Sequence, residues 1–307
     1  MKTVTLRRLA LTLAAVSAGL AVVAAVCLLL KEPPAQEPAA RASVPPVLES
    51  APAAVPEPEP EPTPEIDAGV QAALDAFLRE NPGVWDIRYE SLRTDAFAER
   101  QSGHETEPRS VAASVIKLFV MGAVYDAVEQ GALAHDAVYA DLSAMITQSD
   151  NSACNRLVTQ LGAGDAQRGM DAVDRFAAAQ GCTGTEMARL MLQPGPENYV
   201  TASDCARVLR QIYLGTCVSR DASSEMLTLL LGQTVNDRIP ARLPEGTPVA
   251  HKTGNLANLS CCDVGIVFAP NGDYILCVLS NHAQNDAQTT EAIAALSETV
   301  YAIVTGA

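Results

Sequence analysis

The chain has 307 residues, of which 48% are hydrophobic and 4% aromatic, and this length is ample for one large domain or two small ones. It carries 21 Lys and Arg against 36 Asp and Glu, which gives a formal net charge of −15. Such an acidic chain lacks the positively charged surface that binds nucleic-acid phosphates, so we expect no nucleic-acid partner. The expected partners are small molecules, reached where necessary through a local cationic pocket.

The first 30 residues are predicted to form an N-terminal signal anchor or transmembrane helix. They begin with the basic stretch "MKTVTLRR", and the run from Leu9 to Leu30 carries no charge. That run is long enough to cross the hydrocarbon core as a helix, with its basic end in the cytoplasm. We therefore expect a single-pass protein of the cell membrane whose catalytic part is extracytoplasmic. A secreted protein after signal cleavage is the alternative, and a lipoprotein site at Cys27 is less favoured.

Residues 31–65 are predicted to be an extracytoplasmic linker, because they are rich in proline, glutamate and alanine. Proline prevents helix and sheet formation and like charges repel, so an extended spacer is expected. The globular domain is then residues 66–307. It begins with an amphipathic helix, "IDAGVQAALDAFLREN", which ends at Asn81-Pro82-Gly83.

The next elements alternate between strands and helices. "VWDIRYE" alternates Trp85, Ile87 and Tyr89 with polar residues, and together with "AFAER" it predicts a hairpin. The stretch from Ala112 to Leu214 is predicted to be helical. Strands follow in "TPVAHKTG", "CCDVGIVFA" and "DYILCVLSN", with a turn at residues 270–272 between the last two, and a final amphipathic helix closes the chain.

This order predicts an α/β (α+β) fold in which the early and late strands meet in one antiparallel sheet. The N- and C-terminal helices would flank that sheet, and the inserted all-helical block would form a second lobe. A cleft between the lobes is the expected place for a site.

The cysteines and histidines do not indicate a metal site. There is no Cys-x-x-Cys pair, and His251 and His282 are interpreted as ordinary surface or strand residues. We therefore expect no metal and no cofactor. The seven cysteines after Cys27 are an odd set, interpreted mainly as small buried hydrophobic residues, and the question of a disulfide stays open.

Three short motifs carry the chemistry: "SVIK" at Ser114–Lys117, "SDN" at 149–151 and "KTG" at 252–254. Each alone has an ordinary structural interpretation, as a helix start, a helix cap or a strand end. Together they indicate nucleophilic catalysis, because a serine hydroxyl is a weak nucleophile until a nearby base takes its proton. On a helix Lys117 lies one turn from Ser114, and burial beside a second cation such as Lys252 would lower its pKa.

The three motifs in this order resemble the class A β-lactamases and penicillin-binding proteins, a superfamily of serine hydrolases. The resemblance covers residues 66–307 and implies the β-lactamase/transpeptidase-like fold. It implies that Ser149 relays a proton to the leaving nitrogen, and that backbone N–H groups of Ser114 and Asn255 form an oxyanion hole. The implied site comprises catalytic Ser114, Lys117 and Ser149, substrate-binding Asn151, Lys252, Thr253, Gly254 and Asn255, and the structural residues Asp150 and Arg189.

Two departures from the family bear on turnover. The family's Glu-x-x-Leu-Asn loop, whose glutamate activates the hydrolytic water, has no counterpart in "TEMARLMLQPGPENYV". If Arg189 matches the family's loop arginine, the place of the glutamate falls at Met191, and neither Glu186 nor Glu197 is in register. The spacing from Ser114 to Ser149 is also shorter than the family usually shows, which leaves substrate preference open.

Three functions are therefore considered. The first is hydrolysis of amide or β-lactam bonds through an acyl-enzyme on Ser114, slowed by the missing glutamate. The second is a D-alanyl peptidase or amidase that acts on cell-wall peptides at a bacterial membrane. The third is a non-catalytic peptidoglycan-binding module.

Overall fold

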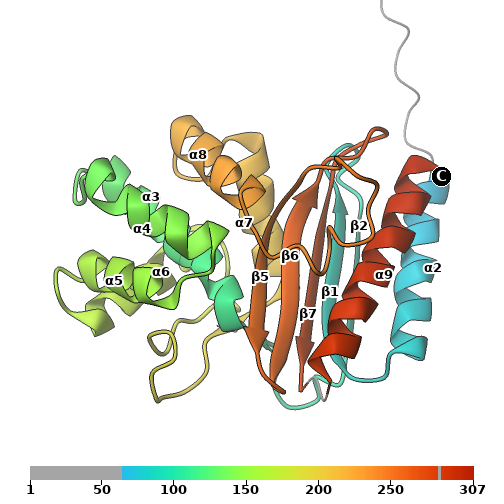
Figure 1. Ribbon diagram of the computed structural model, residues 1–307, viewed down its shortest axis with the longest axis horizontal. Helices are drawn as coiled ribbons and strands as arrows, with labels where there is room; N and C mark the ends of the chain where they lie inside the picture. The colour runs from blue at the N-terminus through green and yellow to red at the C-terminus, as the bar shows by residue number, and fades with distance from the viewer. Residues whose placement is uncertain (1–63, 283–284) are drawn as a thin grey trace, which may run out of the picture. The chain divides into compact units, whose positions relative to one another are not determined.

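The computed structural model describes residues 64–282 and 285–307 (Figure 1). The predicted membrane helix at residues 1–30, and the predicted linker up to residue 63, lie outside the described residues. Within the described part of the chain, no helix is long and apolar enough to cross a membrane. The first described helix, α2, begins at Pro64.

A five-stranded sheet forms the centre of the domain, with the strand order β2-β1-β7-β6-β5. Every neighbouring pair is antiparallel, and β1 pairs with β7 so that Ile87 lies opposite Val278. The early and late strands therefore meet in one sheet, as predicted. The strands are β1 (Val84–Ser91), β2 (Phe97–Ser102), β5 (Val249–Leu256), β6 (Ser260–Val267) and β7 (Tyr274–Asn281).

The terminal helices α2 (Pro64–Glu80) and α9 (Asp286–Thr305) cover one face of this sheet (Figure 1). Trp85, Ile87 and Tyr89 alternate along β1 and point into this layer, where they join Leu74 of α2 and Ile293 of α9. Each such side chain contributes about 1.5–3 kcal/mol when it leaves water. The predicted period of two along β1 is therefore correct.

The helical lobe covers the other face, with α7 packed against β1, β6 and β7. The predicted helical block ended at Leu214, but the structure adds α8 beyond it and has an irregular segment between α6 and α7. A two-stranded ladder of β3 (Ser110–Val111) and β4 (Tyr199–Val200) ties that segment to the start of the lobe. The lobe helices are α3 (Lys117–Glu129), α4 (His135–Thr147), α5 (Asn151–Leu161), α6 (Ala166–Ala179), α7 (Ala202–Leu214) and α8 (Arg220–Leu231).

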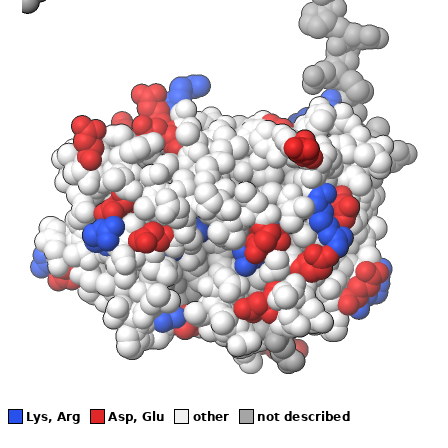
Figure 2. Space-filling model, in the orientation of Figure 1, with Lys and Arg blue, Asp and Glu red and all other residues white. Residues whose placement is uncertain are grey.

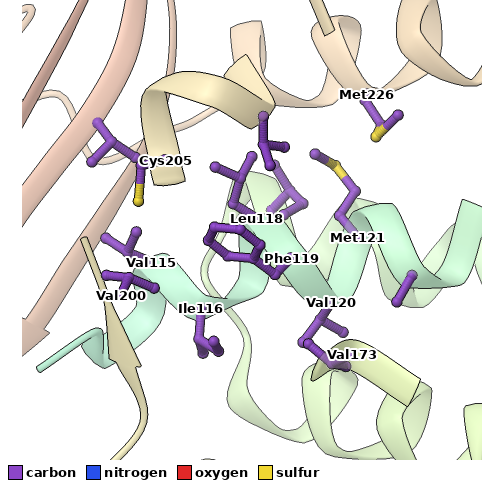
Figure 3. Packing of buried hydrophobic residues seen from close by; sticks show 14 of the residues in the cluster. Val115, Ile116, Leu118, Phe119, Val120, Met121, Val173, Val200, Cys205 and Met226 are labelled. Carbon is purple, nitrogen blue, oxygen red and sulfur yellow. The ribbon is translucent and has the colours of Figure 1, made fainter. Parts of the chain in front are cut away.

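Helix α3 is the core of this lobe, because all of its residues from Lys117 to Tyr125 are buried. The side chains of α3 lie among those of neighbouring helices, including Val173 of α6, Cys205 of α7 and Met226 of α8 (Figure 3). A helix that is apolar on every side is stable only when it is enclosed. The turn that precedes α3 is therefore held rigidly between the lobe and the sheet.

The seven described cysteines are all buried, as predicted, and all of them are free thiols. On the face of the domain seen in Figure 2, acidic and basic side chains are scattered over an otherwise uncharged surface, and several lie beside a side chain of opposite charge. That face shows no continuous positive patch for a polyanion.

Candidate active site

The nucleophile candidate Ser114 lies in a 3₁₀ turn, Ala113–Ile116, that runs directly into α3. The predicted helix start is therefore correct in position but not in type, since the α-helix itself begins at Lys117. Ala113 has a φ of +43°, in the left-handed region that favours glycine. The turn brings Lys117 Nζ to 3.1 Å from Ser114 Oγ.

The "SDN" motif lies at the start of α5. The Asp150 carboxylate caps this helix by accepting a hydrogen bond from Ala153 N at 2.6 Å, which fits its implied structural role. Ser149 precedes the cap with a φ of +59°. That conformation costs energy in a non-glycine residue, and it directs both the carbonyl and the hydroxyl of Ser149 toward Lys117, at 2.6 and 3.2 Å.

Lys252 approaches the same point from strand β5. Its Nζ donates to Ser149 Oγ at 3.0 Å and to Thr253 O at 2.8 Å. Thr253 is buried as well. The Ser149 hydroxyl therefore lies between two fully buried amines, those of Lys117 and Lys252.

Gly254 allows the backbone of β5 to pass directly against the turn that holds Ser114. A β-carbon at Gly254 would lie 3.0 Å from Ala112 O and 3.3 Å from Ser114 N. A larger residue would therefore push the strand away from the nucleophile. The amide of Asn255, the next residue on this strand, is implied by the resemblance to complete an oxyanion hole with Ser114 N.

The hydrogen bonds of Lys117 fit an uncharged amine. Two of its partners, Ser149 O at 2.6 Å and Asn151 Oδ1 at 2.8 Å, only accept hydrogen bonds. A neutral amine has two N–H groups, so these acceptors use both of them. Its lone pair then remains for the hydroxyl proton of Ser114. This is the arrangement that a general base requires.

Burial lowers the pKa of Lys117 to about 8, because the enclosed ammonium loses its water. Burial, together with the nearby charge of Lys117, lowers the pKa of Lys252 to about 7. Near neutral pH the pair therefore tends to hold one proton rather than two. At pH 7 a lysine with a pKa of about 8 is neutral about a tenth of the time, against far less than a hundredth for an ordinary lysine.

The loop from Glu186 to Asn198 closes one side of the cleft. Asn198 Oδ1 accepts from the backbone N–H groups of Ala188 and Arg189, both at 2.9 Å, while the Arg189 guanidinium pairs with Glu197. Glu186 instead pairs with Arg109 at 2.6 Å. Both nearby glutamates are thus engaged by arginines.

If Arg189 matches the loop arginine of the family, Met191 stands at the place of the family's glutamate. The side chain of Asn155 fixes this residue by accepting from Met191 N at 2.8 Å and donating to Met191 O at 3.1 Å. A thioether has no basic oxygen with which to activate water. The loop therefore offers no basic oxygen at Met191 to activate water.

The cleft beside Ser114 is narrow, with a cavity volume of about 40 Å³, which is room for a few water molecules. The structure therefore has little enclosed space beside Ser114. The cleft is lined by Ala113, Ser114, Asn151, Arg189, Leu190, Met191, Leu192, Glu197, Asn198, Asn255 and Leu256.

Several residues of the site were not identified from the sequence. Arg238 is almost fully buried behind β5 and donates from Nη2 to Asn255 Oδ1 at 3.3 Å. His251 was expected to be an ordinary strand or surface residue, but it is buried with Nδ1 2.9 Å from Asp263 Oδ1. Asn155 could have been suspected, because it lies one helical turn after Asn151. The described residues contain no group of three or more acidic, histidine or cysteine side chains suited to a metal ion.

The β-lactamase enzyme family matches this chain over residues 141–304, a stretch that includes Ser149 and Lys252. The chain belongs to this family. Ser114 and Lys117 lie before the matched stretch, so their assignment depends on the geometry above.

Among relatives, the β-lactamase FAR-1 of Nocardia farcinica is 30% identical over 172 residues, which cover 53% of this chain and 52% of the relative. The β-lactamase 3 of Bacillus cereus is 28% identical over 160 residues, covering 50% of this chain and 49% of the relative. The chain thus spans about half the length of these relatives.

Solved structures share the fold over most of the domain. A β-lactamase from Sphaerobacter thermophilus superposes with a TM-score of 0.66 at 24% identity, covering 77% of this chain and 97% of that one. A variant of PBP-A in an acyl-enzyme complex with penicillin G also gives 0.66, at 23% identity, with 76% and 95% covered. At these identities the likeness establishes the fold, which agrees with the predicted fold class.

Proposed function

We propose that the protein is a serine hydrolase that opens amide or β-lactam bonds through an acyl-enzyme on Ser114. The observation that carries this proposal is the 3.1 Å approach of Lys117 Nζ to Ser114 Oγ, made by a buried amine that also contacts two oxygens able only to accept. Family membership supports the proposal, and the relatives named above are β-lactamases.

In the first step neutral Lys117 accepts the hydroxyl proton while Ser114 Oγ bonds to the substrate carbonyl carbon. The carbonyl π electrons move to its oxygen, which the N–H groups of Ser114 and Asn255 would stabilise. Such donors contribute several kcal/mol, since the charge develops only in the transition state. As the C–N bond breaks, the hydroxyl of Ser149 gives its proton to the leaving nitrogen and recovers one from the lysines 3.0 and 3.2 Å away.

Lys252 is placed to hold a substrate carboxylate, together with Thr253, when it keeps its proton. A carboxylate beside it would favour the charged form of Lys252 and leave Lys117 as the neutral partner. This division of one proton between two amines gives each lysine a distinct role. A substrate that carries a carboxylate should therefore be attacked faster than an uncharged one, because it keeps the proton on Lys252 and leaves Lys117 neutral.

Release of the acyl group requires an activated water, and Met191 offers no base for it. Lys117, neutral again after Ser149 has been reprotonated, would have to assist, so we propose a slowly hydrolysed acyl-enzyme. This observation favours a second candidate, a penicillin-binding D-alanyl peptidase or amidase of cell-wall metabolism, whose natural acyl group would leave faster than a β-lactam. The assembled cluster of three motifs argues against a non-catalytic peptidoglycan-binding module.

We also propose, on the sequence alone, that residues 1–30 anchor the protein in a bacterial membrane with residues 66–307 outside the cytoplasm. Extraction of the full chain from membranes by detergent but not by salt or alkali supports this anchoring. Recovery of the chain in the culture medium would instead indicate secretion after signal cleavage.

The function is tested by intact-mass measurement after incubation with penicillin G. The wild-type protein is expected to gain one penicilloyl group, retained for minutes or longer, and Ser114→Ala is expected to gain none. Ser152→Ala, which removes an exposed hydroxyl nearby on α5, is the matched control and should label like the wild type. An unlabelled wild type, or a labelled Ser114→Ala protein, would refute the proposal. Release of a D-alanine from a peptide substrate would favour the second candidate over the first.

A further inference from the structure

A buried histidine–aspartate pair lies behind strand β5, on the face of the sheet that α2 and α9 cover. His251 directly precedes Lys252 on β5, and neighbouring side chains of a strand point to opposite faces, so the imidazole points away from the active site. Its Nδ1 lies 2.9 and 3.1 Å from the two carboxylate oxygens of Asp263 on β6. The two side chains are 1% and 0% exposed. Neither takes part in the proposed proton transfers.

The imidazole of His251 bridges oxygen atoms from two different parts of the chain. On its other side, Nε2 lies 3.0 Å from Oδ1 of Asn236 in the loop before β5. A carboxylate oxygen and an amide oxygen only accept hydrogen bonds, so with the Asn236 amide in this orientation the ring spans them with an N–H on each nitrogen. Gly265 on β6 leaves the space for this side chain, since a β-carbon there would lie 2.6 Å from Cβ of His251.

The pair anchors a loop segment, residues 234–239, that crosses from the helical lobe to the α9 face of the sheet. The segment leaves the lobe at Thr234, whose N–H donates to the carbonyl of Thr147 at the end of α4. It ends at Ile239, whose side chain packs among α2 and α9. The Asp263 carboxylate fixes this end, because its Oδ2 accepts from Ile239 N at 3.0 Å. The histidine and the aspartate thus hold both ends of residues 236–239.

Arg238 lies inside this anchored stretch and reaches the residue that follows the KTG motif. Its side chain is 5% exposed and pairs with Asp237 at 3.2 Å. Its Nη2 donates to Oδ1 of Asn255 at 3.3 Å, and its Nε donates to Sγ of Cys261 at 3.3 Å. Asn255 and Cys261 lie opposite each other on β5 and β6. The guanidinium therefore spans the two strands at this point and tethers the side chain of Asn255.

We propose that His251 and Asp263 are positioning residues, which hold Arg238 against Asn255 and thereby keep the Asn255 N–H aimed at the oxygen of the scissile carbonyl. This role rests on the proposed acyl-enzyme function, in which that N–H stabilises the oxyanion. The pair itself does not touch the reacting atoms. A displaced N–H would slow the chemical step and leave substrate binding nearly unchanged, because negative charge on the carbonyl oxygen develops only in the transition state.

The test measures acylation of the full chain by penicillin G over a range of concentrations, which separates the limiting rate from the half-saturating concentration. His251→Leu removes both contacts of the ring. We expect its limiting rate to fall about tenfold, a part of the roughly 100- to 1000-fold loss that follows removal of an oxyanion donor. The half-saturating concentration should stay close to that of the wild type. Urea unfolding checks that the variant is folded under the assay conditions.

Asn236 provides a second test that leaves the buried pair intact, because this residue is exposed. Asn236→Ala removes the acceptor of Nε2 and should lower the limiting rate in the same direction. Asn236→Asp keeps an acceptor oxygen and should largely restore the rate. His135→Leu is the matched control, since it breaks another histidine–carboxylate contact, 2.8 Å from Glu225 in the helical lobe. It should leave the rate unchanged.

A double-mutant cycle with Arg238→Leu shows whether the histidine acts through the arginine. We expect His251→Leu to slow the wild-type protein but to have little further effect in the Arg238→Leu protein. If His251→Leu does not fold, the same cycle uses Asn236→Ala. An equal loss in both backgrounds would overturn the proposal, and so would wild-type rates in the folded His251→Leu and Asn236→Ala proteins; the acyl-enzyme function would stand in either case. Failure of penicillin G to acylate the wild-type protein would overturn the proposed function, and the positioning role with it.

Discussion

Replacement of Lys252 by methionine is expected to stabilise the folded domain at acidic pH, although it removes a residue of the site. Methionine has nearly the same length and is apolar, so it fills the space that the fully buried lysine occupies. The change removes an ammonium that folding withdraws from water. Stability and catalysis should therefore move in opposite directions at this position.

The magnitude follows from the pKa of Lys252, which is about 7 in the folded protein and about 10.4 in an unfolded chain. The unfolded state binds more protons between these values, so this lysine makes stability rise with pH across that window. Below pH 7 its full penalty applies, about 5 kcal/mol. Loss of the hydrogen bond to Thr253 O offsets about 1–2 kcal/mol. The variant should therefore be more stable by about 3–4 kcal/mol at pH 6.

The assay is urea unfolding of the wild type and of Lys252→Met at pH 6 and pH 9. The advantage of the variant should shrink by about 3 kcal/mol between these values, as the wild-type amine loses its proton. Groups common to both proteins cancel in the difference, including the buried thiols. Arg207→Met, at an exposed position of α7, should show no such pH dependence. A difference between Lys252→Met and the wild type that stayed constant with pH would refute the reasoning.

Three further outcomes are expected at the site. Gly254→Ala should slow acylation of Ser114 by about tenfold to a hundredfold, since its β-carbon would lie 3.0 Å from Ala112 O; acylation at the wild-type rate would show that β5 can move without cost. The rate of acylation should be highest between pH 7 and 8, where the lysine pair holds one proton, and a rate independent of pH from 5 to 9 would contradict this. Met191→Glu should shorten the lifetime of the acyl-enzyme by at least about tenfold, measured by intact mass over time. An unchanged lifetime would mean that water is activated elsewhere.

The sheet could be predicted because its information is local. The alternation of Trp85, Ile87 and Tyr89 indicates that one face of β1 is buried, and the turn at residues 270–272 indicates the hairpin of β6 and β7. The pairing of β1 with β7 followed from the order of elements. Helix α8 was not predicted, since the predicted helical block ended at Leu214.

The site could be predicted where a motif names its residues, as for Ser114, Lys117 and Lys252. The supporting contacts could not, because each joins segments that are far apart in the chain. Asn155 clamps Met191 from another element, and His251 meets Asp263 on the neighbouring strand. Hydrophobic periodicity in the sequence gives no information on such contacts between distant segments.

The most direct test of the central claim is the pKa of Lys117, measured by NMR on the full chain with ¹³C-labelled lysine. The chain has few lysines to resolve, namely Lys2, Lys31, Lys117 and Lys252. The ¹³C signal of one Cε, the carbon bonded to Nζ, should titrate near pH 8 and should be absent in Lys117→Met. If the signal lost in Lys117→Met titrated at the ordinary lysine value of about 10.4, the amine beside Ser114 would be a spectator cation and not the base.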